Sequence, residues 1–406
     1  MMSSKQETTP SFFSELQYQG YGIVIGVLLS IPIGSSAAFF LWALAEVTQI
    51  RMAHSYLLFG LPLAGWAMGY LYHRWGNQAN EGNSLVRTSL VDAQTPIPRR
   101  MGPMVLGSTL VTHLFGASVG REGTALQMAA AMVRPAIQFL KLSKKYYRMA
   151  LTAAIAGGFG AVFGTPWAGL VFAMEWNRKQ PFRMQALLPA CITALLSDAV
   201  CTAWGISHGV FRVPQIPEFS SAYIGWLLAA GILFGLLARS FILLQKGIRK
   251  AATKWIPYPP LRLFWGGLLF VVIVSTLHSD RYTGLGLPVI EEAFLKTLSW
   301  EDSFWKLVLT ALVLGVGYKG GEVTPLFFIG ATMGSALTLV FPYSPGLWAA
   351  MGWVAVFAGA THTPLACMVM AGELFGLEVL SGAAIVCALA YGVSGKNSVY
   401  TDEPIR

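Results

Sequence analysis

A carboxylate stands where a helix is expected to begin. Glu122 follows the glycine-rich turn 116–120 (GASVG), with only Arg121 between them, which we interpret as neutralising charge in the loop. The first turn of a helix carries unpaired N–H groups and the positive end of the helix dipole, so it attracts anions. The Glu122 carboxylate can therefore occupy the place of a small anion, leave on protonation and let the anion enter. The alternative is a simple helix cap.

A second glutamate repeats this arrangement 200 residues later. The segments 120–126 (GREGTAL) and 320–326 (GGEVTPL) align, so Glu322 is the counterpart of the first glutamate. Glu322 could carry a second proton or fix the geometry of its turn, and the sequence leaves both interpretations open. The hydroxyls of Thr124 and Thr324 could contact a bound ligand, or they could cap their own helices.

The repeat extends beyond these two turns. Two Thr-Pro steps recur 198 residues apart, and nine residues after each proline stands a glutamate: Thr165-Pro166 with Glu175, and Thr363-Pro364 with Glu373. Landmarks kept in this order indicate two related halves, approximately 20–205 and 219–395. Transporters built in this way bind their substrate where the two repeats meet. Basic residues follow Glu175, so we interpret it as an interfacial carboxylate paired with them.

The composition predicts that these residues lie in a membrane. The 406 residues are 55% hydrophobic and only 12% charged, with a mean hydropathy of +0.57. Soluble proteins carry about 25% charged residues. A water-soluble enzyme, a nucleic-acid-binding protein and a disordered scaffold are therefore excluded as leading interpretations. The formal net charge of +9 does not change this, because the basic residues gather in loops between apolar runs. We expect an all-α, polytopic integral membrane protein.

Several apolar segments are too short to cross a bilayer, which takes about 20 residues. They begin at clusters of Gly, Pro or Thr: 83–91, 122–133, 166–174, 324–339 and 364–372. Irregular backbone at membrane depth is tolerated where it is buried in protein or lines a cavity. Short helices that meet near the midplane are typical of transporters. We therefore expect broken and re-entrant helices whose N-termini point at an anion.

These motifs resemble those of the CLC superfamily. The segment 120–124 (GREGT) resembles the family signature G-[RK]-E-G-P, and 321–325 (GEVTP) resembles G-x-F-x-P. The segment 81–86 (EGNSLV) stands where chloride-type members have G-S-G-x-P, and Tyr391 in the last helix matches the pore tyrosine. The resemblance runs from about residue 22 to residue 395. It implies a CLC-type fold with two inverted-topology repeats.

The resemblance also implies which residues handle the anion and the proton. Glu122 would be the gating glutamate. Glu322 would be a possible second proton-linked carboxylate, because the inner glutamate position of proton-coupled members holds Trp176 here. The residues that would line the anion path are Asn83, Ser84, Gly123, Thr124, Val323, Thr324 and Tyr391. Whether Asn83 or Ser84 contacts the ion stays open.

Three departures from the family signatures indicate one clade. Thr124 replaces the proline of the first signature, Val323 the phenylalanine of the second, and Asn83 the anion-coordinating serine. This set is similar to the bacterial fluoride/proton antiporters, the CLC-F clade. Fluoride is small and strongly hydrated, so its site must offer strong donors, and an amide offers two N–H donors where a hydroxyl offers one.

The resemblance therefore implies an antiporter that exports fluoride from the cytoplasm in exchange for H+ and confers fluoride resistance. A chloride/proton exchanger or a passive anion channel on the same fold is the alternative. An enzyme is not expected, because the apolar segments carry no clustered catalytic set. No cofactor or metal is expected either, because His113 and His362 stand alone without the spacing of metal ligands.

The remaining expectations concern domains and surroundings. A short polar segment, 1–19, precedes the transmembrane domain, 20–395, and a short polar tail, 396–406, follows without CBS domains. Basic loops such as 239–262 are expected to face the cytoplasm, because Lys and Arg resist translocation. The resemblance implies a homodimer with one pore per subunit in the bacterial inner (plasma) membrane. Its partners would be fluoride ions, protons and the lipid bilayer, with no nucleic acid.

Overall fold

The computed structural model describes residues 12–400, apart from residues 93, 94, 96, 177–183, 210, 212, 214 and 215. Regular structure within these residues is helical, and one isolated bridge joins Gly120 to Gly321. Four helices of the described chain, α1, α8, α9 and α10, are long and apolar enough to cross a membrane. The protein is an all-α, polytopic membrane protein, as the composition predicts.

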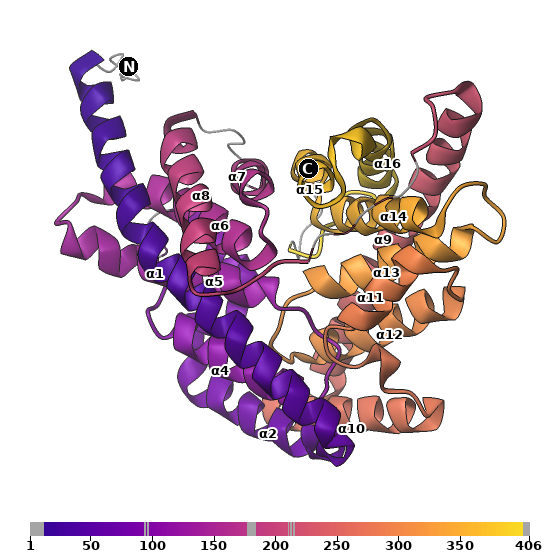
Figure 1. Cartoon of the computed structure of the whole chain (residues 1–406). Helices are drawn as coiled ribbons and strands as arrows, with labels where there is room; N and C mark the ends of the chain where they lie inside the picture. The colour runs from indigo at the N-terminus through magenta and orange to yellow at the C-terminus, as the bar shows by residue number, and fades with distance from the viewer. Residues whose placement is uncertain are drawn as a thin grey trace, which may run out of the picture.

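The helices divide into two halves that correspond in order. The first half consists of α1 (Phe12–Ala53), α2 (Leu61–Leu71), α3 (Asn83–Val91), α4 (Met101–Leu114), α5 (Glu122–Phe139), α6 (Tyr147–Phe163), α7 (Pro166–Glu175) and α8 (Leu187–Ala203). The second half consists of α9 (Ser221–Trp255), α10 (Pro259–Leu277), α11 (Leu287–Leu295), α12 (Trp300–Val316), α13 (Val323–Leu337), α14 (Pro345–Thr361), α15 (Pro364–Phe375) and α16 (Leu380–Val393). The two halves lie side by side, with α7 next to α15 (Figure 1).

A reciprocal pair of caps joins α7 to α15. The carboxylate of Glu373, in the last turn of α15, accepts hydrogen bonds from the N–H groups of Trp167 (3.0 Å) and Ala168 (2.7 Å). The carboxylate of Glu175, at the end of α7, accepts them from Leu365 (3.2 Å) and Ala366 (2.9 Å). The end of each helix therefore caps the start of the other, so these equivalent helices are antiparallel. An antiparallel pair of equivalent helices agrees with an inverted repeat.

The short helices begin where the sequence predicts breaks. α7 and α15 start at Pro166 and Pro364, and proline is favoured there because the first helical N–H has no partner within the helix. α3, α5 and α13 start at or within one residue of the expected positions. Broken helices inside the membrane domain are therefore confirmed.

The centre of each half is a helix covered on nearly every side. In α14 all residues from Gly346 to Thr361 are buried, and in α6 nearly all are. α13 packs tightly on α14. The backbones approach so closely at Gly330 that an added side chain would collide with the backbone of Gly352. Small residues allow such close backbone approach between membrane helices, where apolar attraction is weak.

The ends of the chain differ from the expected polar segments. α1 already begins at Phe12, within the segment 1–19. After α16 the chain turns at Gly395, whose φ of 91° favours glycine, and returns to the core. There the N–H of Val399 donates to the carbonyl of Ala360 (2.9 Å), and Tyr400 is buried. The expected tail 396–406 thus starts as part of the packed domain, and residues 401–406 lie outside the described residues.

Candidate anion path

The two halves meet where α5 and α13 begin. Gly120 and Gly321 exchange backbone hydrogen bonds, and the N–H of Gly321 lies 2.7 Å from the carbonyl oxygen of Gly120. Only glycine fits, because a Cβ on Gly120 would lie 2.9 Å from the oxygen of Gly321. The bridge therefore holds two helix starts, with their unpaired N–H groups, close together.

Glu122 reaches from the start of α5 to the start of α13. Its Oε2 accepts hydrogen bonds from the N–H of Thr324 (3.1 Å) and of Arg121 (3.0 Å). The hydroxyl of Thr324 donates to Oε1. The side chain is 1% exposed, and the Arg121 guanidinium lies 3.6 Å from Oε1. The carboxylate thus occupies the positive end of the opposite half's helix, a place that suits an anion.

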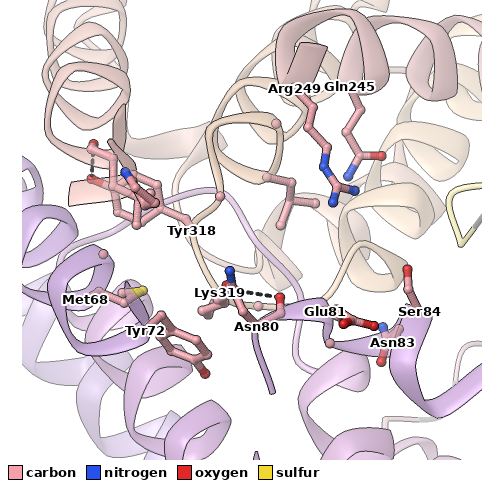
Figure 2. Close-up of a pocket in the computed structure, with 18 of the residues that line it drawn as sticks. Met68, Tyr72, Asn80, Glu81, Asn83, Ser84, Gln245, Arg249, Tyr318 and Lys319 are labelled. Atoms are coloured by element: carbon pink, nitrogen blue, oxygen red, sulfur yellow. Dashed lines mark hydrogen bonds between the residues drawn. The ribbon is translucent and has the colours of Figure 1, made fainter. Parts of the chain in front are cut away.

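A cavity of about 220 Å³ lies beside this junction. Asn83 and Ser84 line it from the start of α3, and Glu322 lines it from the turn before α13. Figure 2 shows Asn83 and Ser84 near Glu81, with Arg249 and Gln245 projecting from α9. The sequence left open whether Asn83 or Ser84 contacts the ion, and both line the same cavity. An ion that enters it would meet the amide and the hydroxyl together.

Gln127 fixes the amide of Asn83. Its Nε2 donates to Oδ1 of Asn83 (3.2 Å), so the Nδ2 donors of Asn83 point away from Gln127. This Nδ2 lies against Gly123, where a Cβ would come within 2.8 Å of it. Gly123 and Gln127 are four residues apart, so they share one face of α5. The absent side chain of one and the donor of the other position the amide.

Several cationic side chains line the cavity, beside the carboxylates of Glu81 and Glu322. Lys319 donates from Nζ to the side-chain oxygen (2.8 Å) and backbone oxygen (3.2 Å) of Asn80, and it lies over the ring of Tyr72 (Figure 2). This contact ties the turn before α13 to the 3₁₀ helix Asn77–Glu81 of the first half. Arg249 of α9 and Arg262 of α10 also line the cavity. The positive potential they create raises the local concentration of anions.

Of the two tyrosines near the end of the described chain, Tyr400 lines the cavity and Tyr391 does not. Tyr391 is 40% exposed and packs edge-on against His362, outside the cavity. Tyr400 lines the cavity and is 4% exposed, and its hydroxyl has no hydrogen-bond partner among the described residues. The assignment of Tyr391 to the path is therefore wrong, because α16 ends at Val393 and the returning segment supplies the other tyrosine.

The remaining predicted residues have other surroundings. The hydroxyl of Thr124 hydrogen-bonds that of Thr109 on α4 (2.6 Å), so it joins two helices instead of lining the cavity. Val323 is buried in the first turn of α13. Trp176, at the inner glutamate position, is buried and packs edge-on against Tyr400 with ring centroids 5.1 Å apart. An aromatic contact thus fills that position.

Sequence reasoning missed Gln127, Lys319 and Tyr400. Each carried a weak signal: a polar residue in an apolar helix, a charge in a glycine-rich turn, and a tyrosine just after the glycine that ends the last helix. Glu175 also caps α15, a role that the sequence did not suggest. The basic residues proposed as its partners lie outside the described residues. In the described part of the chain, no group of three His, Cys, Asp or Glu side chains could hold a metal ion.

The fold and the junction together define an inverted-repeat membrane protein of the ion-transport class. Residues 63–395 match the voltage gated chloride channel family. The chain belongs to this family, the CLC family.

Curated relatives agree with this assignment. The chain is 41% identical over 397 residues to the "Chloride/fluoride channel protein" of Pseudomonas syringae pv. tomato, covering 96% of this chain and 88% of that protein. It is 27% identical to the "H(+)/Cl(-) exchange transporter ClcA" of Vibrio vulnificus, covering 68% of this chain and 64% of that one.

Solved structures have the same fold. The crystal structure of a CLC-type fluoride/proton antiporter superposes with a TM-score of 0.91 at 33% identity, covering 97% of this chain and 98% of that one. A slow cyanobacterial Cl-/H+ antiporter superposes with a TM-score of 0.77 at 18% identity, which reflects the fold alone.

Proposed function

We propose that the protein is a fluoride/proton antiporter that exports fluoride from the cytoplasm in exchange for protons. The similarity to a fluoride/proton antiporter over nearly the whole of both chains supports this function. The observation that carries the mechanism is the Glu122 carboxylate bound to the N–H and hydroxyl of Thr324. These donors are the ones a small anion would use.

The proposed cycle alternates carboxylate and fluoride at the start of α13. Fluoride enters from the cation-lined cavity and meets the amide of Asn83. When Glu122 takes up a proton, it loses its charge and its attraction to the helix N-terminus, and fluoride takes its place. Return of the carboxylate expels the ion, and the proton leaves in the opposite direction. Glu322 could pass the proton inward or only shape the cavity, and both roles stay open.

The setting of the protein is part of the proposal. We place it in the bacterial inner membrane as a homodimer with one pore per subunit, where fluoride export would confer resistance. α7 and α15 are too short to span a bilayer, yet Trp167 and Leu365 at their starts are exposed within one chain. A second subunit could cover them. Native mass spectrometry should give twice the mass of 43.9 kDa, and a single-chain mass would contradict the dimer.

A chloride/proton exchanger or a passive channel is the second candidate, supported by the names of the relatives. The test is efflux from proteoliposomes loaded with equal fluoride and chloride while pH is recorded. The proposal predicts fluoride release far above chloride, with protons moving the opposite way. Comparable chloride release indicates a general exchanger, and release without proton movement indicates a channel.

A further inference from the structure

An apolar groove runs along α1, α4 and α5, separate from the cation-lined cavity. Its volume is about 730 Å³, within the range of ~300–1,000 Å³ for ligand sites. Pro32 of α1, Leu106 of α4 and Ala136 of α5 line it. Both α1 and α5 contain an internal proline at the groove, Pro32 and Pro135, and proline bends a helix. The lining of the groove is apolar apart from Ser36 and Arg99, which suits an acyl chain.

Three arginines surround a second hollow at the end of this groove. Arg99 and Arg100, from the turn before α4, and Arg134 of α5 line a space of about 410 Å³ together with Gln138. Arg99 lines both the hollow and the groove, so the two are continuous. Nη2 of Arg99 donates to the side-chain oxygen of Gln138, which holds this guanidinium at the boundary.

The arginines remain available for an external anion. All three are exposed, and the ion pairs of the described residues include none of them. Guanidinium groups bind phosphate through paired N–H donors, which suits a phosphate more than a single halide.

The charge pattern assigns the arginine hollow to the cytoplasmic leaflet. α5 ends at Phe139, and Lys141, Lys144 and Lys145 follow within one short turn. Such clusters lie on the cytoplasmic side, where the membrane surface is negative because of its anionic lipids. The apolar groove therefore suits an acyl chain, and the arginines with the flanking lysines suit the anionic phosphate of the same lipid.

We propose that the groove and the arginine hollow bind one anionic phospholipid of the inner leaflet. An acyl chain lies along α1, α4 and α5, and the phosphate contacts Arg99, Arg100 and Arg134. Burial of the chain supplies affinity shared by all lipids, and the arginines supply the preference for net negative charge. The site shares no lining residue with the cation-lined cavity, so a failure of this proposal would not count against the proposed antiport.

Lipid binding by the purified, delipidated protein tests this site. The full chain is titrated with phosphatidylglycerol or with phosphatidylcholine of the same acyl chains, and bound lipid is counted by native mass spectrometry. The wild type should bind phosphatidylglycerol at least about tenfold more tightly. The double variant Arg99→Gln/Arg134→Gln should bind phosphatidylglycerol about 30-fold more weakly, the factor expected for two lost charges, and lose less of its affinity for phosphatidylcholine, whose ammonium offsets the charge of its phosphate. Ala136→Trp, which fills the groove, should weaken both lipids.

The matched control removes two charges elsewhere. Lys250→Gln/Lys254→Gln alters exposed cations at the end of α9 and should leave the preference intact. Equal binding of the two lipids by the wild type, which requires no variant, would overturn the proposal. An equal loss in the control variant would also overturn it, because the effect would then be general surface charge. Thermal unfolding without lipid verifies that each variant is folded.

Discussion

At the scale of single residues, the junction depends on one carboxylate that crosses between halves. Glu122 belongs to α5, yet its acceptors are satisfied mainly by Thr324 of α13. A buried carboxylate needs such donors, because an unpaired charge in an apolar interior is costly. The same donors can serve fluoride only when the carboxylate is protonated or displaced, and this competition would couple the two ions.

Glu122→Gln should abolish the coupling. The amide has nearly the same shape but cannot exchange a proton, so proton movement during fluoride efflux should fall to background. The measurement is the pH record of loaded proteoliposomes, with the exposed Glu46→Gln of α1 as the control. Persistent proton movement would exclude Glu122 from the role. Glu322→Gln separates its two open roles, because only a proton carrier would lose proton movement while anion efflux continues.

Gln127→Met should lower fluoride efflux about tenfold. It removes the donor to Asn83 and leaves the amide free to turn, and a hydrogen bond of this kind contributes about 0.5–1.5 kcal/mol. The fluoride-to-chloride efflux ratio should fall as well, which a merely structural defect would not cause. The exposed Gln49→Met of α1 is the control. An unchanged ratio with normal folding would show that Gln127 does not position the site.

The sequence identified the residues whose own types carry chemistry. Glu122 and Glu322 stand out because charges in apolar segments are costly to bury, whereas Asn83 and Ser84 came from the resemblance to the CLC superfamily. Gln127 and Tyr400 could not be found in this way, because their importance comes from neighbours brought together by folding. Tyr391 was chosen instead because it stands in the last helix and matches the pore tyrosine in the resemblance, and only the chain path after Gly395 corrects that choice.

At the scale of helices, the halves are joined by exchanged caps. Breaks at Gly, Pro and Thr clusters predicted where α3, α5, α7, α13 and α15 begin, because these residues end or start helices for local reasons. The helix start that each glutamate caps could not be predicted, because Glu373 and Glu175 contact residues 206 and 190 positions away in the sequence. A glutamate at the end of a helix opposes the dipole of that helix but stabilises the start of another.

Glu373→Ala should destabilise the fold by about 1–2 kcal/mol, the usual cost of losing a helix cap. The N–H groups of Trp167 and Ala168 would lose their acceptor, and α7 should fray first. Thermal unfolding in detergent measures the loss, and Glu373→Gln, which keeps one acceptor oxygen, should lie between. The exposed Glu378→Ala, on the next turn of the chain, should unfold like the wild type. If both alanine variants unfold alike, the exchanged caps contribute no stability.

At the scale of the whole molecule, the two antiparallel halves place the N-termini of α5, α7, α13 and α15 near the interface between the halves. The landmarks repeated 200 residues apart predicted two halves, but the direction of the repeat came from the resemblance and not from spacing. The capping exchange between α7 and α15 now supplies a physical basis for the inversion. The same symmetry brings the starts of α5 and α13 together at the bridge between Gly120 and Gly321.

The most direct test of the account is whether a fluoride gradient drives protons uphill. Proteoliposomes with high internal fluoride and equal pH on both sides are diluted into fluoride-free buffer, with the membrane voltage clamped by a potassium ionophore. The account predicts that protons enter as fluoride leaves, so that the interior becomes more acidic than the bath. Fluoride efflux without any inward proton movement would contradict antiport and would make the protein a channel.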